Sequence, residues 1–232
     1  MGNVREAVET YLQGYPPALK LFQQLVKVGE LYLIGGVLRE YKDNGTINEL
    51  RDADFIIDIK DEALWKKMLE EYQPRGNHFD GYKFYCENHF LVDIWEVDKT
   101  WAYRNGIITY DKANYLESLP KTVFLNMDSI IYDLNADKWY DAIYQEAICS
   151  KVLDIVLKEN PHVELNILRS LVLRRRYEMA YSDELQSLIL QYMNTDVDFV
   201  NTLLDIQYNR YHKEVLSREE IEQELTMIKK EK

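Results

Sequence analysis

Short runs of β-branched and aromatic residues alternate with helical segments over roughly the first 110 residues of the chain, and these runs stop before Gln145. Such side chains are typical of strands because they pack well on a pleated, half-buried surface. The expected strands are Leu31–Ile34, Asp54–Ile59, Tyr82–Tyr85, Phe90–Trp95 and Ile107–Tyr110. The alternation indicates one sheet with helices packed on it, so this part of the chain is α/β in rhythm.

Helical spacing of apolar residues predicts the other elements. It covers Val4–Val28, where Pro16–Pro17 break or restart the helix, and then Val37–Lys42 and Asp61–Tyr72. From Gln145 onward apolar residues recur at intervals of three and four, which predicts an all-helical C-terminal region. We therefore expect an α+β protein with a sheet domain at residues 1–144 and a helical domain at residues 145–232.

The charge balance limits the possible ligands. The 232 residues contain 28 Lys and Arg against 40 Asp and Glu, a formal charge of −12. This balance argues against an extended nucleic-acid surface, because such a surface needs many cations along the phosphate backbone. A local phosphate site inside an acidic protein remains compatible with the composition.

The apolar runs are far shorter than the roughly 20 residues that a membrane helix needs. The N-terminus lacks an apolar signal-peptide core, and the two cysteines are too few for a disulfide framework. The expected location is the cytoplasm, with no membrane partner.

A glycine pair follows the first expected strand. Gly35 and Gly36 lie between Leu31–Ile34 and Val37–Lys42. Glycines at this point let backbone N–H groups approach a ligand closely, and the helix N-terminus favours an anion such as phosphate. Taken alone, such a pair marks an ordinary tight turn more often than a phosphate site.

Two acids, Asp52 and Asp54, lie at the start of a hydrophobic strand. The two-residue period of a strand places both on one face, with their Cα atoms roughly 7 Å apart, so that their side chains can converge on a divalent metal ion. The alternative is a polar strand start with solvated acids.

A third acid, Asp93, interrupts the apolar run Phe90–Trp95. An acid in such a run usually binds metal, accepts several hydrogen bonds or pairs with a cation. Three acids on two adjacent strands fit a two-metal site that activates an attacking hydroxyl and stabilises the charge developing on phosphorus.

The order of these motifs resembles the polymerase-beta-type nucleotidyltransferase superfamily, and specifically the head and neck domains of bacterial poly(A) polymerases and CCA-adding enzymes. Residues 35–40 are similar to that family's Gly-Gly-x-Val-Arg-Asp, and residues 52–55 to its Asp-hydrophobic-Asp-hydrophobic. Fainter similarity continues through residues 121–126, 132–134, 139–141 and 167–171.

The resemblance implies a mixed sheet flanked by helices, followed by a helical neck. It also implies transfer of a nucleoside monophosphate from an NTP to a hydroxyl group, with release of pyrophosphate and dependence on Mg²⁺ or Mn²⁺. The implied metal ligands and catalytic residues are Asp52, Asp54 and Asp93. The implied nucleotide-binding residues are Gly35, Gly36, Arg39, Lys121, Asn126 and Arg169.

The chain departs from this family at its recognition motifs. Pro120-Lys121-Thr122 stands where these enzymes carry Arg-Arg-Asp, a motif associated with ribose recognition. Residues 162–166 replace the Glu-Asp-x-x-Arg motif that reads the incoming base. Without fixed donors and acceptors at a base edge, discrimination between C and A is expected to be weak or differently built.

Arg174, Arg175 and Arg176 are consecutive on a predicted helix. Three consecutive helical positions spread over about 200°, so they cannot form one nucleic-acid-binding stripe. We interpret the triplet as solvated or ion-paired surface.

Two functions remain open at this level. The first is a nucleotidyltransferase acting on a small molecule, a protein or a tRNA end, in that order of preference on charge grounds. The second is a non-catalytic protein of the same fold that binds a nucleotide or a partner and regulates another process. The predicted oligomeric state is a monomer or a homodimer.

Overall fold

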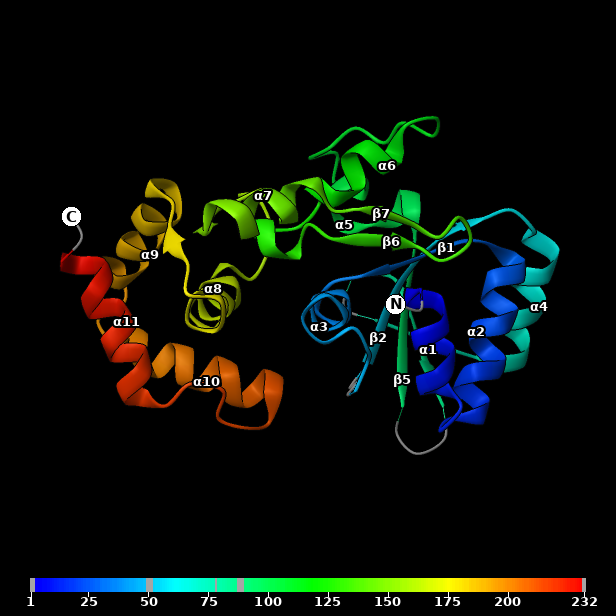
Figure 1. The fold of residues 1–232 in the computed structure, drawn as a ribbon, viewed down its shortest axis with the longest axis horizontal. Coiled ribbons are helices and arrows are strands. Elements are labelled where there is room, and N and C mark those ends of the chain that lie inside the picture. The colour runs from blue at the N-terminus through cyan, green and yellow to red at the C-terminus, as the bar shows by residue number, and fades with distance from the viewer. Residues whose placement is uncertain (1–2, 49–51, 78, 87–89, 231–232) are drawn as a thin grey trace. The chain divides into compact units, whose positions relative to one another are not determined.

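The computed structural model describes residues 3–48, 52–77, 79–86 and 90–230 (Figure 1). These residues form two compact units. The first comprises residues 1–122 and 128–142, and the second comprises residues 123–127 and 143–232. The main division falls after residue 142, and the short segment 123–127 belongs to the second unit.

A mixed sheet of seven strands organises the first unit, in the order β3-β4-β5-β2-β1-β6-β7. β2 and β5 run parallel, and every other neighbouring pair runs antiparallel. The strands are β1 Gly29–Ile34, β2 Asp52–Ile59, β3 Arg75–Gly76, β4 Tyr82–Tyr85, β5 Leu91–Glu96, β6 Ile131–Asp133 and β7 Lys138–Tyr140. The α+β class predicted from the sequence is confirmed.

The predicted strand at Ile107–Tyr110 is wrong. These residues follow a short helix that ends near Gly106, whose φ is +67°, and the N–H groups of Ile107 and Ile108 donate to Ala102 O. Ile108 and Tyr110 pack against the apolar cluster on the sheet from a loop. Their β-branched and aromatic character therefore reflects burial, not strand pairing.

The helices of the first unit begin at residues suited to helix starts. Asn3 and Glu6 form a capping box at the first helix, and Pro16–Pro17 occupy the first two positions of the second. The helices are α1 Val4–Leu12, α2 Pro16–Val28, α3 Gly36–Asn44, α4 Glu62–Tyr72, α5 Trp101–Arg104 and α6 Tyr115–Ser118, with 3₁₀ turns at Val97–Lys99 and Leu119–Lys121. A further 3₁₀ turn, Asn126–Asp128, crosses the division between the units.

One face of the sheet packs on α2 and α4. Phe55 of β2 contacts Phe22 of α2 with ring centroids 5.9 Å apart, and Tyr82 of β4 contacts Trp65 of α4 at 5.3 Å. The opposite face carries a second apolar cluster built on Tyr32. Its other buried members are Ile56, Val97, Tyr103, Tyr115, Leu119 and Ile131. Because strand residues alternate between faces, Asp54 of β2 lies on the same face as Ile56.

A chain of hydrogen bonds runs through this second cluster. The hydroxyl of Tyr115 donates to Asp58 Oδ2 at 2.9 Å and lies 2.7 Å from the hydroxyl of Tyr32. Burial raises the pKa of both phenols well above the usual value near 10. Both tyrosines therefore stay neutral in the folded protein when they would ionise in the unfolded chain.

Tyr115→Phe is expected to flatten the loss of stability at alkaline pH. A folded-state pKa above the unfolded one contributes stability that is complete below about pH 10 and is lost as pH rises toward the folded-state pKa. Removing one such proton lowers the pH dependence of the free energy of unfolding by up to about 1.4 kcal/mol per pH unit. The lost hydrogen bonds cost about 1 kcal/mol at pH 7. Urea unfolding at pH 7 measures the cost of the lost hydrogen bonds, and urea unfolding between pH 10 and 11.5 measures the pH dependence of the stability.

The matched control is Tyr208→Phe, because Tyr208 is 69% exposed. Its alkaline slope should equal that of the unmodified protein. An unchanged slope in Tyr115→Phe would show that the buried phenol does not govern alkaline stability.

The second unit is helical apart from two short parallel strands. Its helices are α7 Ala142–Ser150, α8 Val163–Tyr177, α9 Asp183–Thr195, α10 Phe199–Tyr211 and α11 Arg218–Lys230, and its strands are β8 Val152–Leu153 and β9 Ala180–Tyr181. The strands were not expected, because two residues are too few to show a period. No helix in the described ranges is long and apolar enough to cross a membrane.

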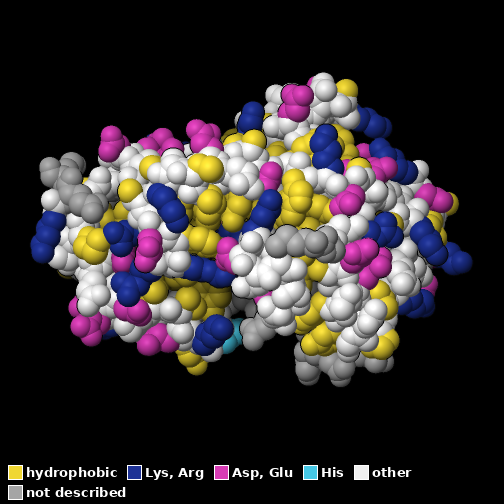
Figure 2. Space-filling model, in the orientation of Figure 1, with side chains coloured by type: hydrophobic (Ala, Val, Ile, Leu, Met, Phe, Trp, Pro, Cys, Tyr) yellow, Lys and Arg dark blue, Asp and Glu magenta, His cyan; other side chains and the backbone are white. Residues whose placement is uncertain are grey.

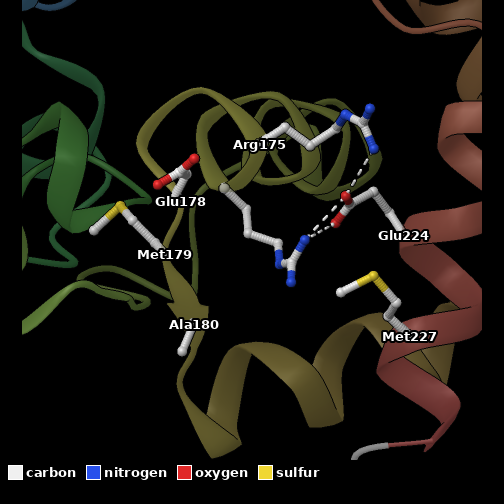
Figure 3. A pocket seen from close by; sticks show the side chains of 7 residues that line it. Arg175, Glu178, Met179, Ala180, Glu224 and Met227 are labelled. Atoms are coloured by element: carbon white, nitrogen blue, oxygen red, sulfur yellow. Dashed lines mark hydrogen bonds and ion pairs between the residues drawn. The ribbon is translucent and has the colours of Figure 1, made fainter.

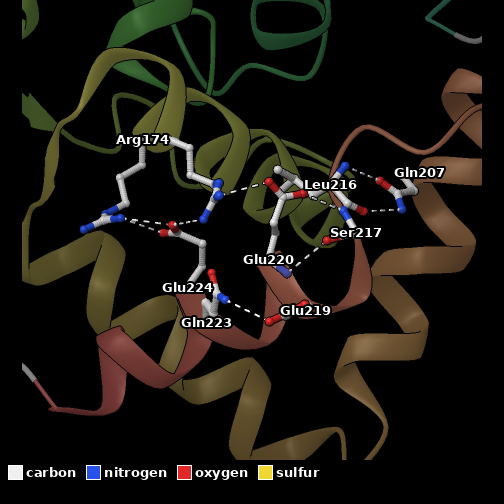
Figure 4. A network of polar contacts seen from close by, with 9 residues as sticks. Arg174, Gln207, Leu216, Ser217, Glu219, Glu220, Gln223 and Glu224 are labelled. Atoms are coloured by element: carbon white, nitrogen blue, oxygen red, sulfur yellow. Dashed lines mark hydrogen bonds and ion pairs between the residues drawn. The ribbon is translucent and has the colours of Figure 1, made fainter.

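A buried acid joins α8 to α11 (Figure 4). Glu224 is only 1% exposed and accepts hydrogen bonds at 3.0 to 3.1 Å from Arg174 and Arg175. Arg175 also pairs with Glu220 at 2.9 Å, and Glu220 forms a capping box with Ser217 at the start of α11. Two arginines of the triplet therefore hold the helices together, as the ion-paired interpretation predicts.

Candidate active site

The first part of the site is the turn between β1 and α3. Gly35 has φ +79° and ψ −143°, a backbone conformation that residues with a side chain rarely adopt. A Cβ atom on Gly35 would meet no atom within 4 Å, so the backbone borders open space. The N-terminus of α3 carries partial positive charge beside this space and favours an anion.

The second part is a pair of acids on adjacent strands. Asp54 of β2 lies directly opposite Asp93 of the parallel strand β5. Neighbouring strands are about 4.8 Å apart, so the two side chains leave the same face at short range. The pairing of β1 with β2, which places Leu33 opposite Phe55, brings the Gly35 turn to this acidic end of the sheet.

The third acid of the prediction, Asp52, is the first residue of β2. Its backbone pairs with Leu91, and its side chain lies outside the described residues. The structure therefore brings Asp54 and Asp93 together, and the part played by Asp52 stays a prediction.

Asp93 is held by two side chains that the sequence analysis did not single out. Its carboxylate is 9% exposed, with Lys83 Nζ 3.1 Å from Oδ2. Asn77 Nδ2 donates to Oδ1 at 3.1 Å. An acid buried to this extent needs such compensation. The strand pattern of Tyr82–Tyr85 already placed Lys83 on one face, but only the register puts it beside Asp93.

Arg39, in the first turns of α3, pairs with Asp128. The two side chains are 11% and 5% exposed, so this is a buried ion pair. A Cβ atom on Gly36 would lie 3.4 Å from Arg39 Nη2, which places the guanidinium against the glycine turn. Arg39 therefore packs against the turn. Its charge is balanced by Asp128, an acid that the sequence analysis did not identify.

Three comparisons test the resemblance. No protein-family model matches the chain, and no curated protein matches it. The structure is similar to a Thermotoga maritima CCA-adding enzyme complexed with tRNA, with a TM-score of 0.60, 13% identity, and coverage of 92% of this chain and 51% of that chain. The chain therefore shares the fold of the matched part of this CCA-adding enzyme.

Two further structures share this fold. A tRNA-processing enzyme with CTP matches with a TM-score of 0.54, 14% identity, and coverage of 86% of this chain and 53% of that chain. A CCA-adding enzyme complexed with ATP matches with a TM-score of 0.54, 14% identity, and coverage of 86% of this chain and 50% of that chain. The chain thus spans about half the length of each of these proteins.

The two facing acids of the sheet have the donor chemistry of a magnesium site. Carboxylate oxygens are the ligands that Mg²⁺ prefers, and Asp54 and Asp93 present them from neighbouring strands. Within the described residues, no three His, Cys, Asp or Glu side chains are grouped closely enough to hold a metal ion. Asp52, the third predicted ligand, has its side chain outside the described residues.

The remaining predicted nucleotide-binding residues are dispersed along the chain. Lys121 is exposed in the 3₁₀ turn Leu119–Lys121 of the first unit. Asn126 belongs to the second unit, where Nδ2 donates to Val152 O at 2.9 Å and Oδ1 accepts from Asp154 N at 3.1 Å. Arg169 is half-buried on α8 of the same unit. Asn126 thus anchors a loop, and contact of these three residues with a nucleotide stays a prediction.

A pocket of about 580 Å³ lies in the second unit, between the end of α8 and α11 (Figure 3). Its lining residues are Arg174, Arg175, Glu178, Met179, Ala180, Glu224 and Met227. Both arginines point to Glu224, and their charges are balanced by Glu220 and Glu224. The pocket therefore has no excess positive charge for a triphosphate, which leaves the acids of the sheet as the candidate site.

Proposed function

We propose that the chain is a metal-dependent nucleotidyltransferase that transfers a nucleoside monophosphate from an NTP to a hydroxyl acceptor and releases pyrophosphate. The observation that carries this proposal is the opposition of Asp54 and Asp93 on parallel strands beside the Gly35 turn. Acids for a metal and a backbone turn for phosphate are the two requirements of this chemistry. The nucleotidyltransferase fold supports the same assignment.

Each part of the site has a role in this proposal. The turn at Gly35 and Gly36 and the N-terminus of α3 bind the triphosphate through backbone N–H groups. Asp93 orients the acceptor hydroxyl and receives its proton, while Lys83 and Asn77 hold the carboxylate in place. Asp52 and Asp54, with Asp93 completing the set, would hold Mg²⁺ or Mn²⁺, which when bound would neutralise charge developing on the phosphoryl oxygens.

Arg39 acts on the nucleotide through the turn. Its guanidinium lies against Gly36 and is fixed by Asp128, so it orients the N–H groups that face the phosphates. The roles of Lys121, Asn126 and Arg169 toward the nucleotide rest on the family resemblance alone, and Asn126 anchors its own loop through Val152 O.

The acceptor is expected to be compact. On the face seen in Figure 2, Lys and Arg side chains are interspersed with Asp and Glu and form no continuous basic stripe. The net charge of −12 also opposes a long polyanion. A small molecule, a protein side chain or the end of a tRNA each satisfies this condition, whereas a tRNA body needs a basic surface.

Calorimetric titration with each NTP tests the proposal directly. Binding is expected to require Mg²⁺ or Mn²⁺, because the metal ion offsets repulsion between the triphosphate and the acids. Pyrophosphate release from the bound NTP is then measured with a cell extract as the source of acceptor. Metal-independent NTP binding without pyrophosphate release would contradict the proposal.

A second function is favoured by one observation. Lys83 already neutralises Asp93, and Asp128 already neutralises Arg39, as in a site that no longer turns over. A non-catalytic protein that binds a nucleotide or a partner fits these pairs. Tight NTP binding with persistent absence of pyrophosphate release would favour this second function.

A further inference from the structure

A row of charged residues crosses the sheet on the acidic side of the site. Asp54 of β2 lies opposite Asp93 of β5, Asp93 lies opposite Lys83 of β4, and Lys83 lies opposite Arg75 of β3. Two acids are thus followed by two cations toward the edge of the sheet. By strand spacing, the row extends about 10 Å from β5 to β3.

The cations and an exposed tyrosine share the face that carries the acids. Lys83 reaches Asp93 on this face, and Tyr85 lies two residues further along β4, so its ring leaves the same face. The intervening Phe84 points the other way, against Tyr72 of α4. The guanidinium of Arg75 lies over the Tyr85 ring at 5.2 Å from its centroid.

This edge is exposed and carries positive charge. Tyr85 is 58% exposed, and Arg75 is also exposed. Among the described residues no acid is paired with Arg75. An exposed aromatic ring beside an arginine is the combination that binds a base by stacking and a phosphate by charge.

In-line attack on phosphorus puts the acceptor on the side of the sheet formed by β5, β4 and β3. In phosphoryl transfer the attacking oxygen and the leaving pyrophosphate lie in line on opposite sides of phosphorus. The Gly35 turn follows β1, which borders β2 on one side, whereas β5, β4 and β3 continue on the other. With the triphosphate on the β1 side, the attacking hydroxyl approaches from the β5 side, over Asp93.

We infer that Arg75 and Tyr85 form an acceptor site for a single nucleotide unit, with the phosphate on Arg75, the base stacked on Tyr85 and the free hydroxyl directed to Asp93. The inference rests on the proposed nucleotidyl transfer and deepens it by assigning the chemical class of the acceptor. One phosphate contact and one stacking ring suit a nucleotide or the terminal residue of an RNA. The two residues offer no contacts for further phosphates of a longer nucleic-acid strand.

Calorimetry with the dinucleotide CpA, which has one phosphodiester and a free 3′ hydroxyl, tests the inference. The protein is first saturated with Mg²⁺ and an α,β-methylene NTP analogue, so that CpA cannot enter the NTP site. Arg75→Met is expected to weaken CpA binding about tenfold and to leave adenosine binding unchanged, because adenosine has no phosphate. Tyr85→Leu is expected to weaken binding of both about tenfold, through lost stacking.

Lys138→Met is the matched control. Lys138 lies over the ring of Tyr140 at 4.7 Å on β7, at the opposite edge of the same sheet, so the variant removes a similar cation–π pair away from the acids. Its CpA affinity should equal that of the unmodified protein. Thermal melting confirms that all three variants are folded.

The outcomes separate the inference from the function on which it rests. Unchanged CpA affinity in both site variants overturns the acceptor site, even when the NTP analogue binds with Mg²⁺. Failure of the NTP analogue to bind overturns the proposed function, and CpA is then titrated alone to test the acceptor site. Inorganic phosphate binding as tightly as CpA overturns the role of Tyr85.

A comparison of tRNA binding with CpA binding distinguishes an RNA end from a free nucleotide. Deacylated tRNA that binds more tightly than CpA, with the shallow salt dependence of a single phosphate contact, supports an RNA end as the natural occupant, whereas a steep salt dependence would contradict the single-phosphate site. Equal affinity and a shallow salt dependence support a free nucleotide. Both results agree with the same chemistry at Arg75 and Tyr85.

Discussion

Asp54→Asn is expected to lower the rate of metal-dependent pyrophosphate release by about 10³-fold, equivalent to about 4 kcal/mol of transition-state stabilisation. The amide keeps the size of the side chain but removes the charge that faces Asp93 across the two parallel strands. A neutral amide is a much weaker ligand for Mg²⁺ than a carboxylate. Pyrophosphate release at saturating NTP and Mg²⁺ measures the effect.

Asp93→Asn is expected to cause a similar loss of rate for two reasons. It removes the group that receives the acceptor proton, and it leaves Lys83 without its partner. This variant is therefore also expected to be less stable than Asp54→Asn. Comparing the two melting temperatures separates the loss of charge at the site from a loss of folding.

Asp58→Asn is the control for both variants. Asp58 lies on the same strand and the same face as Asp54, four residues further on, but it accepts a hydrogen bond from Tyr115 instead of facing Asp93. Removing this charge should leave pyrophosphate release nearly unchanged. If Asp54→Asn and Asp58→Asn release pyrophosphate at similar rates, Asp54 is not part of the active site.

Gly29→Ala is expected to destabilise the first unit by about 3 kcal/mol. Gly29 begins β1 opposite Ile59 of β2, and its φ of 179° is ordinary extended backbone. The reason is steric, because a Cβ atom would lie only 2.1 Å from the carbonyl oxygen of Asp58. A backbone atom of a paired strand cannot move aside as a flexible side chain can.

Gly76→Ala is the matched control for this effect. Gly76 also lies in a strand of the same sheet, and a Cβ atom there would meet no atom within 4 Å. Urea unfolding of the two variants should therefore differ by most of the expected 3 kcal/mol. Equal stabilities would mean that the strand pair relaxes to accept the methyl group.

Local patterns predicted most of the regular structure of the first unit. Tyr82–Tyr85 is a strand with the predicted bounds, and Asp61 caps α4 where the helical pattern begins. The reason is that two-residue alternation and helix caps depend on neighbours in the sequence. Ile107–Tyr110 shows the limit, because a loop whose apolar residues pack partly against the sheet has the same composition as a strand.

The candidate site was likewise predicted only in part from the sequence. Its acids and glycines were found from spacing along the chain, because a strand places alternate residues on one face and a glycine turn is local. The partners of Asp93 and Arg39 were not found, since Lys83, Asn77 and Asp128 reach them only across strands or through the fold.

The sequence by itself determined the α+β class, most helix and strand positions, and the chemistry available at Asp54, Asp93 and the glycine turn. Only the tertiary structure decided the strand order and register, and hence that Asp93 lies between Asp54 and Lys83 with Arg75 beyond. The physical reason is that strand pairing joins segments distant in sequence. A shift of one residue would move every one of these side chains to the opposite face.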